Sequence, residues 1–253
     1  MKLSLIDMVQ DILSDMDSDE VNSIDDTVES LQVAQIVKTV YFQMCSNRNW
    51  GDQKRLTVIQ HSGDITKPTH LQLPENTKEL IYIAYNVKKE EDTGPLDEYR
   101  KLQYRYPDEF LRMVNTRPRS NDSYEEVEDF GGVKLFIKNN SEPTYWTSFD
   151  DKFIVCDSYN AAVDTTLQAS KTQALVVQMP TWEMRDDFIP HFPVEAFSAL
   201  LAEAKSTAFL VLKQMANEKA EAASRRQQTW LARKNSTAKN GVRYQTYGRV
   251  GKK

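Results

Sequence analysis

Hydrophobic positions near the start of the chain recur at the spacing of a helix. Within residues 3–16 they are separated by one or three residues, at Leu5, Ile6, Val9, Ile12, Leu13 and Met16. This periodicity predicts an amphipathic helix, which the acidic stretch from Asp15 to Glu20 ends. A second helix is expected from near Asp26, because Asp26 and Glu29 have the spacing of a capping box, and its apolar stripe runs from Val28 to Met44.

The middle of the chain changes to the period of strands. Residues 56–61 and 79–85 are rich in β-branched and aromatic side chains and predict two strands. Pro95 is expected to open a helical stretch with Leu96, Tyr99 and Leu102, and Pro107 a short helix through Val114. The polar residues 115–132 predict a surface loop. Four further strands are expected, at 133–138, 144–148, 153–157 and 174–179, and the short turns between the first three favour an antiparallel sheet.

A long helix is predicted after Pro190 and Pro193. One helical face carries the apolar residues Phe197, Leu200, Leu201, Ala204, Ala208, Val211, Leu212 and Met215. Good helix formers continue through Lys234, which would give a single helix of roughly 60 Å. The face becomes polar after Met215, so the second half is expected to project from the core or to dock on a partner.

Together these elements predict an α+β protein. We expect an antiparallel helix bundle built from the N-terminal helices and one long C-terminal helix, a central antiparallel β-region and an extended C-terminal tail. The corresponding segments are residues 1–55, 56–189, 190–234 and 235–253. The tail has too few apolar residues for a core, so it is expected to be flexible until it is bound.

Composition narrows the class of protein. The 253 residues are 40% hydrophobic, with 10 Phe, 11 Tyr and 4 Trp, which is sufficient for a core. No apolar run approaches the roughly 18 residues of a membrane span, and the acids near the N-terminus argue against a signal peptide. Cys45 and Cys156 fit reduced core thiols better than a disulfide framework. A soluble protein of intracellular origin is therefore expected.

Charge is distributed unevenly along the chain. The net charge is −5, yet residues 225–253 contain nine Lys and Arg and no acid, whereas the first 31 residues contain nine acids and one Lys. An acidic body repels the phosphate backbone and is a poor general binder of nucleic acid. The basic tail, in which Tyr244 and Tyr247 alternate with Arg243 and Arg249, suits an acidic protein surface, a nucleic acid or both. A tail that serves only solubility is the simpler alternative.

Motifs for catalysis or metal binding are weak. Asp15, Asp17 and Asp19 have the spacing that begins a calcium loop, but Glu20 stands where the loop requires Gly. The histidines have no metal-ligand spacing, and the nucleophile elbow, the P-loop and the dinucleotide fingerprint are missing. We therefore expect no metal site and no cofactor. The acidic pairs Asp150/Asp151 and Asp186/Asp187 suit either turns or a carboxylate-pair enzyme.

Three segments resemble the head-to-tail adaptor proteins of short-tailed bacteriophages, the tail tubular protein A type. They are MVQDILSDMDSDEVNSIDDTVESLQVAQIVKTVYFQM, YWTSFDDKFIVCDSYN with the following VDTTLQASK, and PVEAFSALLAEAKSTAFLVLKQMANEKAEAASRRQQTWLARKN. They cover about half of the chain. The first resembles the family's front pair of helices, the second its β-region, and the third its late helix with a double-Arg continuation.

This resemblance implies a structural protein of the virion without catalysis. Such proteins form a ring, commonly of twelve copies, that joins the portal protein to the tail nozzle or tail tube protein and extends the DNA channel, with no membrane involved. The chain would be assembled in the host cytoplasm and reside in the neck of the particle. The resemblance also implies that the C-terminal segment docks on the portal, through Arg225, Arg226, Trp230, Arg233, Lys234, Lys239, Arg243, Tyr244, Tyr247, Arg249, Lys252 and Lys253.

Two other functions remain open at this point. One is a carboxylate-pair hydrolase of the tail that acts on cell-envelope glycan, with an acidic pair such as Asp150 and Asp151 as its site. The other is a small DNA-binding accessory protein that uses the basic tail, against which the lack of a recognisable reading helix or zinc framework counts.

Overall fold

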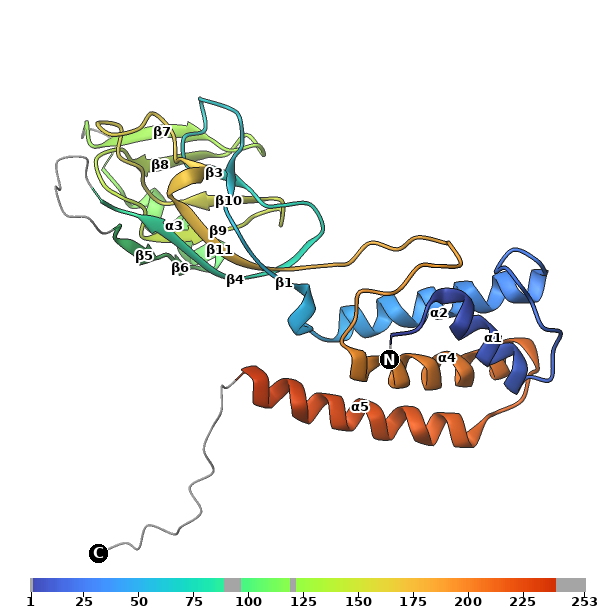
Figure 1. Ribbon diagram of the computed structural model, residues 1–253. Helices are drawn as coiled ribbons and strands as arrows, with labels where there is room; N and C mark the ends of the chain where they lie inside the picture. Colours follow the sequence, from blue (N-terminus) through green and yellow to red (C-terminus); the bar gives the residue numbers. More distant parts are fainter. Residues whose placement is uncertain (1, 89–96, 119–121, 240–253) are drawn as a thin grey trace, which may run out of the picture. The chain divides into compact units, whose positions relative to one another are not determined.

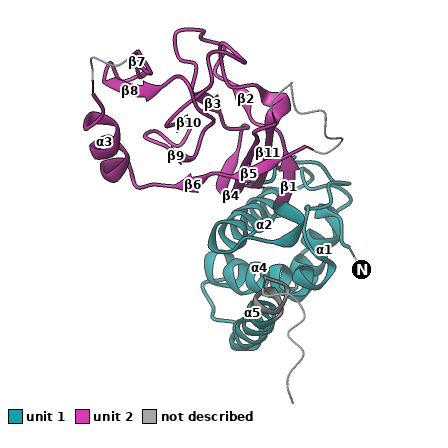
Figure 2. Ribbon diagram, turned by 90° about the vertical axis from the view of Figure 1, so that its left-hand side faces the viewer, with its two compact units in different colours: residues 1–53, 179–253 teal, residues 54–178 magenta. Residues whose placement is uncertain are grey.

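The computed structural model describes residues 2–88, 97–118 and 122–239, and the side chains of residues 2–88, 97–118 and 122–233. The chain folds into two compact units (Figure 2), one made of Met1–Gln53 with Met179–Lys253 and the other of Lys54–Gln178. The fold is mixed α+β with antiparallel sheets, as the sequence predicts. The contacts place residues 179–189 with the helical unit, whereas the sequence analysis assigns them to the central region.

The helical unit contains α1 (Leu5–Asp15), α2 (Val28–Asn47), α4 (Phe197–Leu212) and α5 (Glu218–Lys239), with short 3-10 turns η1 (Gly51–Gln53) and η3 (Val194–Ala196). Helices α1, α2 and α4 pack on one another, and α5 packs chiefly on α4 (Figure 1). The predicted apolar face of α1 is confirmed, since Leu5, Val9, Ile12 and Leu13 are buried. Burial of this face, rather than helix propensity, holds so short a helix in place.

Helix α2 begins at Val28, close to the predicted start near Asp26, but its cap differs. Thr27 is the N-cap, and Thr27 and Ser30 form a capping box, with Ser30 N donating to Thr27 Oγ1 at 3.0 Å. The expected cap residue Asp26 instead accepts hydrogen bonds from the amides of Asn22 and Ser23, at 2.7 and 2.8 Å. The carboxylate therefore closes the preceding turn, a role for which Asp is equally suited.

The prediction of a single long helix after Pro190 is wrong. Helix α4 ends at Leu212 and α5 begins at Glu218, so the second half of the segment folds back along the first (Figure 1). Gln214 has a left-handed backbone, with φ of 53°, which ends α4. Asn217 then caps α5, because its side chain accepts a hydrogen bond from the amide of Ala220 at 3.0 Å. Residues 235–239, expected in the tail, belong to α5.

The second unit is rich in strands. They are β1 (Lys54–Thr57), β2 (Gln60–His61), β3 (His70–Gln72), β4 (Thr77–Asn86), β5 (Tyr99–Lys101), β6 (Gln103–Tyr104), β7 (Tyr124–Glu128), β8 (Lys134–Lys138), β9 (Tyr145–Thr147), β10 (Phe153–Cys156) and β11 (Thr172–Gln178). They form a sheet in the order β1-β11-β4-β5, a second in the order β2-β3-β10-β9-β6 and the pair β7-β8. The pairings are antiparallel except for β6 with β9. Helix α3 (Pro107–Asn115) contacts β8 and β9 and buries Phe110 and Val114, and a 3-10 turn, η2 (Ala169–Lys171), precedes β11.

Two expectations for this unit are wrong. The helix expected from Pro95 is not formed at Tyr99–Tyr104, where β5 and β6 lie instead; Pro95 and Leu96 themselves lie outside the described residues. Pairing of Tyr99–Lys101 with β4 decides the conformation there, which is a long-range contact that local propensity does not contain. The polar segment 115–132 contains β7, which pairs with β8 and buries Val127.

Neither cysteine forms a disulfide, and both are buried, as the sequence predicts. Within the described part of the chain, no helix combines the length and the apolar composition that a bilayer crossing requires.

Candidate functional site

Helix α5 carries the described members of the predicted docking set. The side chains of Arg225, Arg226, Trp230 and Arg233 lie in its middle part, and all of them are exposed. Lys234 and Lys239 fall within α5, but their side chains are not among those described. The remaining predicted residues, Arg243, Tyr244, Tyr247, Arg249, Lys252 and Lys253, lie outside the described residues. The site that can be built is therefore the outward surface of α5.

One face of α5 is turned toward α4 and fixes which residues point away from it. Ser224 and Leu231 are buried, at 1% and 3% exposure. The Ser224 hydroxyl donates to the Glu203 carboxylate on α4, and the Gln228 amide donates to the same carboxylate at 3.2 Å. Since positions 224, 228 and 231 share one helical face, the neighbouring positions 225, 226, 229 and 233 are directed outward.

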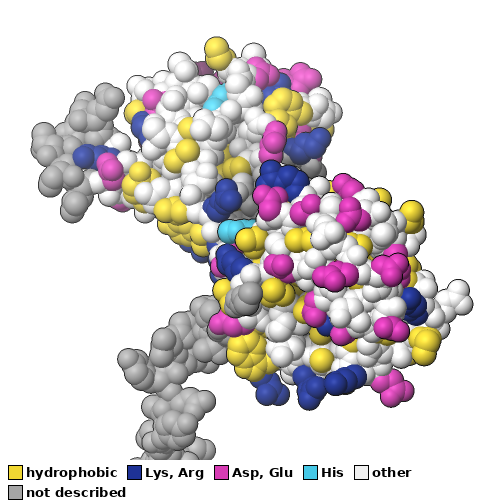
Figure 3. Space-filling model, turned by 45° about the vertical axis from the view of Figure 1, so that its right-hand side comes forward, with side chains coloured by type: hydrophobic (Ala, Val, Ile, Leu, Met, Phe, Trp, Pro, Cys, Tyr) yellow, Lys and Arg dark blue, Asp and Glu magenta, His cyan; other side chains and the backbone are white. Residues whose placement is uncertain are grey.

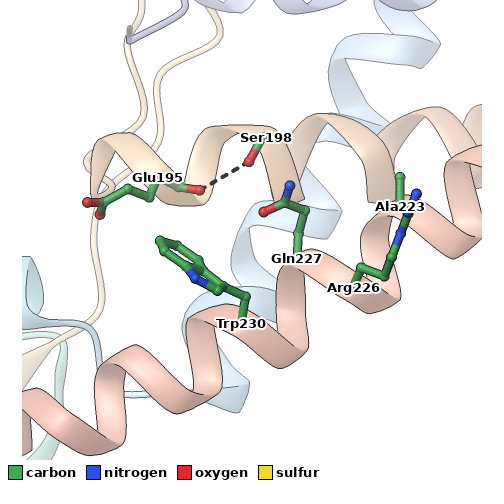
Figure 4. A pocket seen from close by; sticks show the side chains of 6 residues that line it. All are labelled: Glu195, Ser198, Ala223, Arg226, Gln227 and Trp230. Atoms are coloured by element: carbon green, nitrogen blue, oxygen red, sulfur yellow. Dashed lines mark hydrogen bonds between the residues drawn. The ribbon is translucent and has the colours of Figure 1, made fainter.

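A cleft of about 690 Å³ lies between α5 and the start of α4. Figure 4 shows Gln227 and Trp230 directed from α5 toward the start of α4. The lining of the cleft also includes Glu195, Ser198, Ala223 and Arg226. On the α4 side of the cleft, the Ser198 hydroxyl donates a hydrogen bond to the Glu195 carbonyl at 3.2 Å. Trp230 is 48% exposed and forms part of this wall.

A second hollow of about 310 Å³ lies on α5 itself and shares Arg226 and Trp230 with the first. Arg225, Thr229 and Arg233 complete it. Arg225 forms an ion pair with Glu221 one turn earlier, and the Arg225 side chain remains 78% exposed. Three guanidinium groups and one indole therefore occupy adjoining positions on a single helix, which we call the α5 surface (Arg225, Arg226, Thr229, Trp230 and Arg233).

Acidic and basic side chains are unevenly distributed over the helical unit. In Figure 3, Asp and Glu side chains are spread over the visible face of the unit, while Lys and Arg side chains gather at its lower edge, where α5 lies. The acids include Asp11 and Asp15 of α1, both of which bond Lys205 of α4, at 2.9 and 2.6 Å. A cationic helix on an otherwise acidic unit attracts negatively charged groups more strongly than the rest of the unit does.

The α5 surface combines groups that bind anions with one exposed aromatic ring. Guanidinium groups bind carboxylates and phosphates through two parallel hydrogen bonds, and they stack on flat groups. A half-exposed Trp among Arg residues is the composition found at the energetic centre of many interfaces. The arrangement can hold an acidic, partly apolar surface.

The acidic pairs that the sequence offers for catalysis serve turns and local contacts. Asp150 Oδ1 accepts hydrogen bonds from the amides of Lys152 and Phe153, at 3.0 and 2.9 Å. Asp186 Oδ1 accepts one from the amide of Ile24 at 2.8 Å, and Asp187 pairs with Arg185 at 3.1 Å. Within the described residues, no group of three or more His, Cys, Asp and Glu side chains is arranged to hold a metal ion.

Sequence reasoning missed an aromatic cleft in the β-rich unit. About 600 Å³ in volume, it is lined by Leu80–Ile83 of β4, by Lys101–Tyr104 and by Trp146 of β9. The rings of Tyr104 and Trp146 meet edge to face, with centroids 4.9 Å apart. The density of aromatic residues at Tyr104, Tyr106, Tyr145 and Trp146 is the signal that could have located it.

No known protein family matches this chain, and a search of curated proteins found no similar sequence.

Proposed function

We propose that this protein is a structural component of a short-tailed phage particle, a head-to-tail adaptor that joins the portal to the tail nozzle. The α5 surface is the observation that carries the proposal, because it presents Arg225, Arg226, Trp230 and Arg233 together on one exposed helix. In this proposal the helical unit is an antiparallel helix bundle, and α5 with the basic residues that follow it docks on acidic portal surface. The three segments that resemble this adaptor family support the same function.

The proposed assembly is a homo-oligomeric ring in the neck of the virion. Around a DNA channel, the acidic remainder of the chain is physically suitable, since a negative wall repels phosphates and lets the genome pass without adhering. Residues 1–224 carry 37 acids and 23 basic side chains. An electron cryo-microscopy reconstruction of the ring with a strongly basic lumen would contradict this part of the proposal.

Portal binding is tested by co-sedimentation of the purified chain with portal rings. Arg226→Glu reverses one charge in the centre of the α5 surface, and we expect binding to weaken about tenfold or more. Trp230→Ala is expected to weaken it similarly, through loss of the exposed indole. Lys219→Glu is the matched control, because it makes the same change of charge on an exposed residue of the first turn of α5.

Each outcome has a distinct meaning. Equal binding by Arg226→Glu and Lys219→Glu would remove the α5 surface from the proposal while leaving the adaptor. If the unaltered chain does not bind portal rings but retards DNA in a salt-dependent manner, the adaptor proposal is wrong and the DNA-binding accessory function replaces it.

A further inference from the structure

The connection between α4 and α5 adopts a turn that its sequence does not favour. Gln214 has φ of 53°, in the left-handed region where glycine is the usual residue. The five connecting residues, Lys213–Asn217, include neither Gly nor Pro. A β-carbon at a left-handed position is disfavoured by its contact with the backbone, so the turn stores local strain.

The same five residues are compatible with a continuous helix. Lys, Gln, Met and Ala at positions 213–216 are among the stronger helix formers, and α4 and α5 flank them directly. Straightening the connection would relieve the left-handed residue and produce one helix from Phe197 to Lys239, about 65 Å long. The apolar periodicity that predicts a single long helix from the sequence therefore describes a conformation that the chain can adopt locally.

The turn is not held by a core of its own. Leu210, Val211 and Met215 surround it and are 62%, 59% and 65% exposed. Besides the backbone hydrogen bonds of Lys213 and Met215 to the Phe209 carbonyl, at 3.1 and 3.2 Å, the docking of α5 on α4 favours the folded-back arrangement, and it fully buries few of the described α5 side chains. Among the described side chains of α5, Ser224 and Leu231 are the buried ones. Glu203 holds this face through its hydrogen bonds to Ser224 and Gln228.

We infer that α5 is an exchangeable arm, which leaves its own α4 and docks in the same way on α4 of a second copy of this chain. The second copy is the matching partner, because Glu203 of α4 already accepts hydrogen bonds from Ser224 and Gln228, and Leu231 already packs in the core of the helical unit. Exchange preserves these contacts and removes the strained turn, which are the conditions that favour domain swapping. If each copy passes α5 to the next, the contact is head to tail and can close into a ring. This inference needs only the purified chain, so it stands or falls independently of portal binding.

Cross-linking between mixed single-cysteine variants tests the exchange. Ser198 of α4 and Gln227 of α5 line the same cleft (Figure 4). Chains carrying Ser198→Cys are mixed with chains carrying Gln227→Cys at high protein concentration and treated with a short bismaleimide. A cross-linked dimer is expected, because α5 of one chain lies on α4 of the other. The native Cys45 and Cys156 are buried, and the unaltered chain serves as the control for their reactivity.

Two further variants make the outcome decisive. A single chain with both Ser198→Cys and Gln227→Cys is expected to cross-link internally when dilute, which establishes that the reagent spans the cleft. Gln214→Gly removes the strain and weakens the continuous helix, so we expect at least about tenfold less cross-linked dimer. Gln214→Ala should give as much dimer as chains that keep Gln214, because Ala retains the β-carbon and favours a helix. Absence of mixed dimers while the internal control reacts, or equal yields with Gly and Ala at position 214, would overturn the inference.

Discussion

The imidazole of His70 lies against the carboxylate of Asp129, with Nε2 2.9 Å from Oδ1, in a site where the His70 side chain is fully buried. The other ring nitrogen, Nδ1, has no hydrogen-bond partner among the described residues. The ring of Phe130 packs edge to face on the imidazole, with centroids 5.6 Å apart. A neutral imidazole that donates from Nε2 satisfies this geometry, whereas a protonated ring would bury a second N–H without an acceptor.

We expect this histidine to make the protein less stable in mild acid. Burial lowers the pKa of His70 below its ordinary value of 6.5, and the hydrogen bond to Asp129, which acts in the opposite direction, does not compensate; Lys67 and His61 lower it further. Since the unfolded chain binds the proton more readily, stability is lost as the pH falls below about 6.5, by up to about 1.4 kcal/mol per pH unit until the folded pKa is reached.

Urea unfolding at pH values from 7.5 to 5.5 measures this loss, and His70→Gln isolates it. Gln retains a donor toward Asp129 but does not titrate, so the variant should show a flatter dependence on pH. His191→Gln is the control, because the side chain of this histidine is exposed. Parallel pH profiles of the His70→Gln variant and the unaltered chain would contradict the assignment.

Arg117 follows α3, contacts β8 and the residue after β10, and should be required for stability. Its guanidinium donates to the carbonyls of Phe136 and Asp157, at 3.0 and 2.6 Å, and to the Asp157 carboxylate at 3.0 Å. The side chains of Arg117 and Asp157 are nearly buried, at 13% and 8% exposure. Arg117→Met leaves these acceptors without a cation, and we expect a loss of about 3 kcal/mol in the free energy of unfolding.

Arg105→Met provides the comparison for this prediction. Arg105 pairs with Glu109 at 3.6 Å at an exposed helix end, where the Arg105 side chain is 43% exposed and the Glu109 side chain 51%. Loss of such a surface pair should cost less than about 1 kcal/mol. Urea titration measures the free energy of unfolding of both variants. Equal losses would show that the Arg117 contacts stabilise the unit no more than a surface ion pair does.

Lys205 is expected to contribute a smaller amount, in the helical unit. Burial alone would lower its pKa, but its hydrogen bonds to Asp15 and Asp11 outweigh this effect and raise it. Lys205→Met keeps the apolar stem and removes the cation, so we expect about 1 kcal/mol of destabilisation, because both acids are roughly half exposed. Lys213→Met removes two exposed contacts, with Ser18 Oγ at 3.2 Å and with Glu29 at 3.6 Å, and should be close to neutral in thermal unfolding. A larger effect at Lys213 would reverse this ranking.

The elements predicted well from the sequence are those that local signals determine. The strands around Val133–Lys138 and Phe153–Asp157 are bounded by Asn and Asp turns, and α3 begins at a proline that suits a first helical position. The strands at Tyr99–Tyr104 and Tyr124–Glu128 were missed because their pairing partners lie elsewhere in the chain. A short segment takes the conformation of the sheet edge it joins, and that edge is not visible in its own residues.

The candidate site was predictable in composition and not in geometry. The cluster of Arg and Trp on α5 follows directly from the sequence, but its position beside α4 depends on the break at Lys213–Asn217. Asn217 followed by Glu218 and Glu221 is a recognisable helix start, so this signal was present. The uninterrupted helix formers around it outweighed that signal in the prediction, and Gln214 gives no sequence indication of a left-handed turn.

The docking of α5 should depend on Leu231 far more than on its exposed neighbour. Leu231 is 3% exposed and is the large apolar side chain that α5 buries among its described residues, whereas Trp230 is 48% exposed. Leu231→Ala is expected to weaken docking by about 2 kcal/mol, so the amides of α5 should exchange with deuterium roughly thirtyfold faster while those of α1 and α2 are unchanged. Trp230→Ala, the adjacent control, should leave this exchange near its original rate. Protection of α5 that survives Leu231→Ala would mean that Glu203 with Ser224 and Gln228 holds the helix without it.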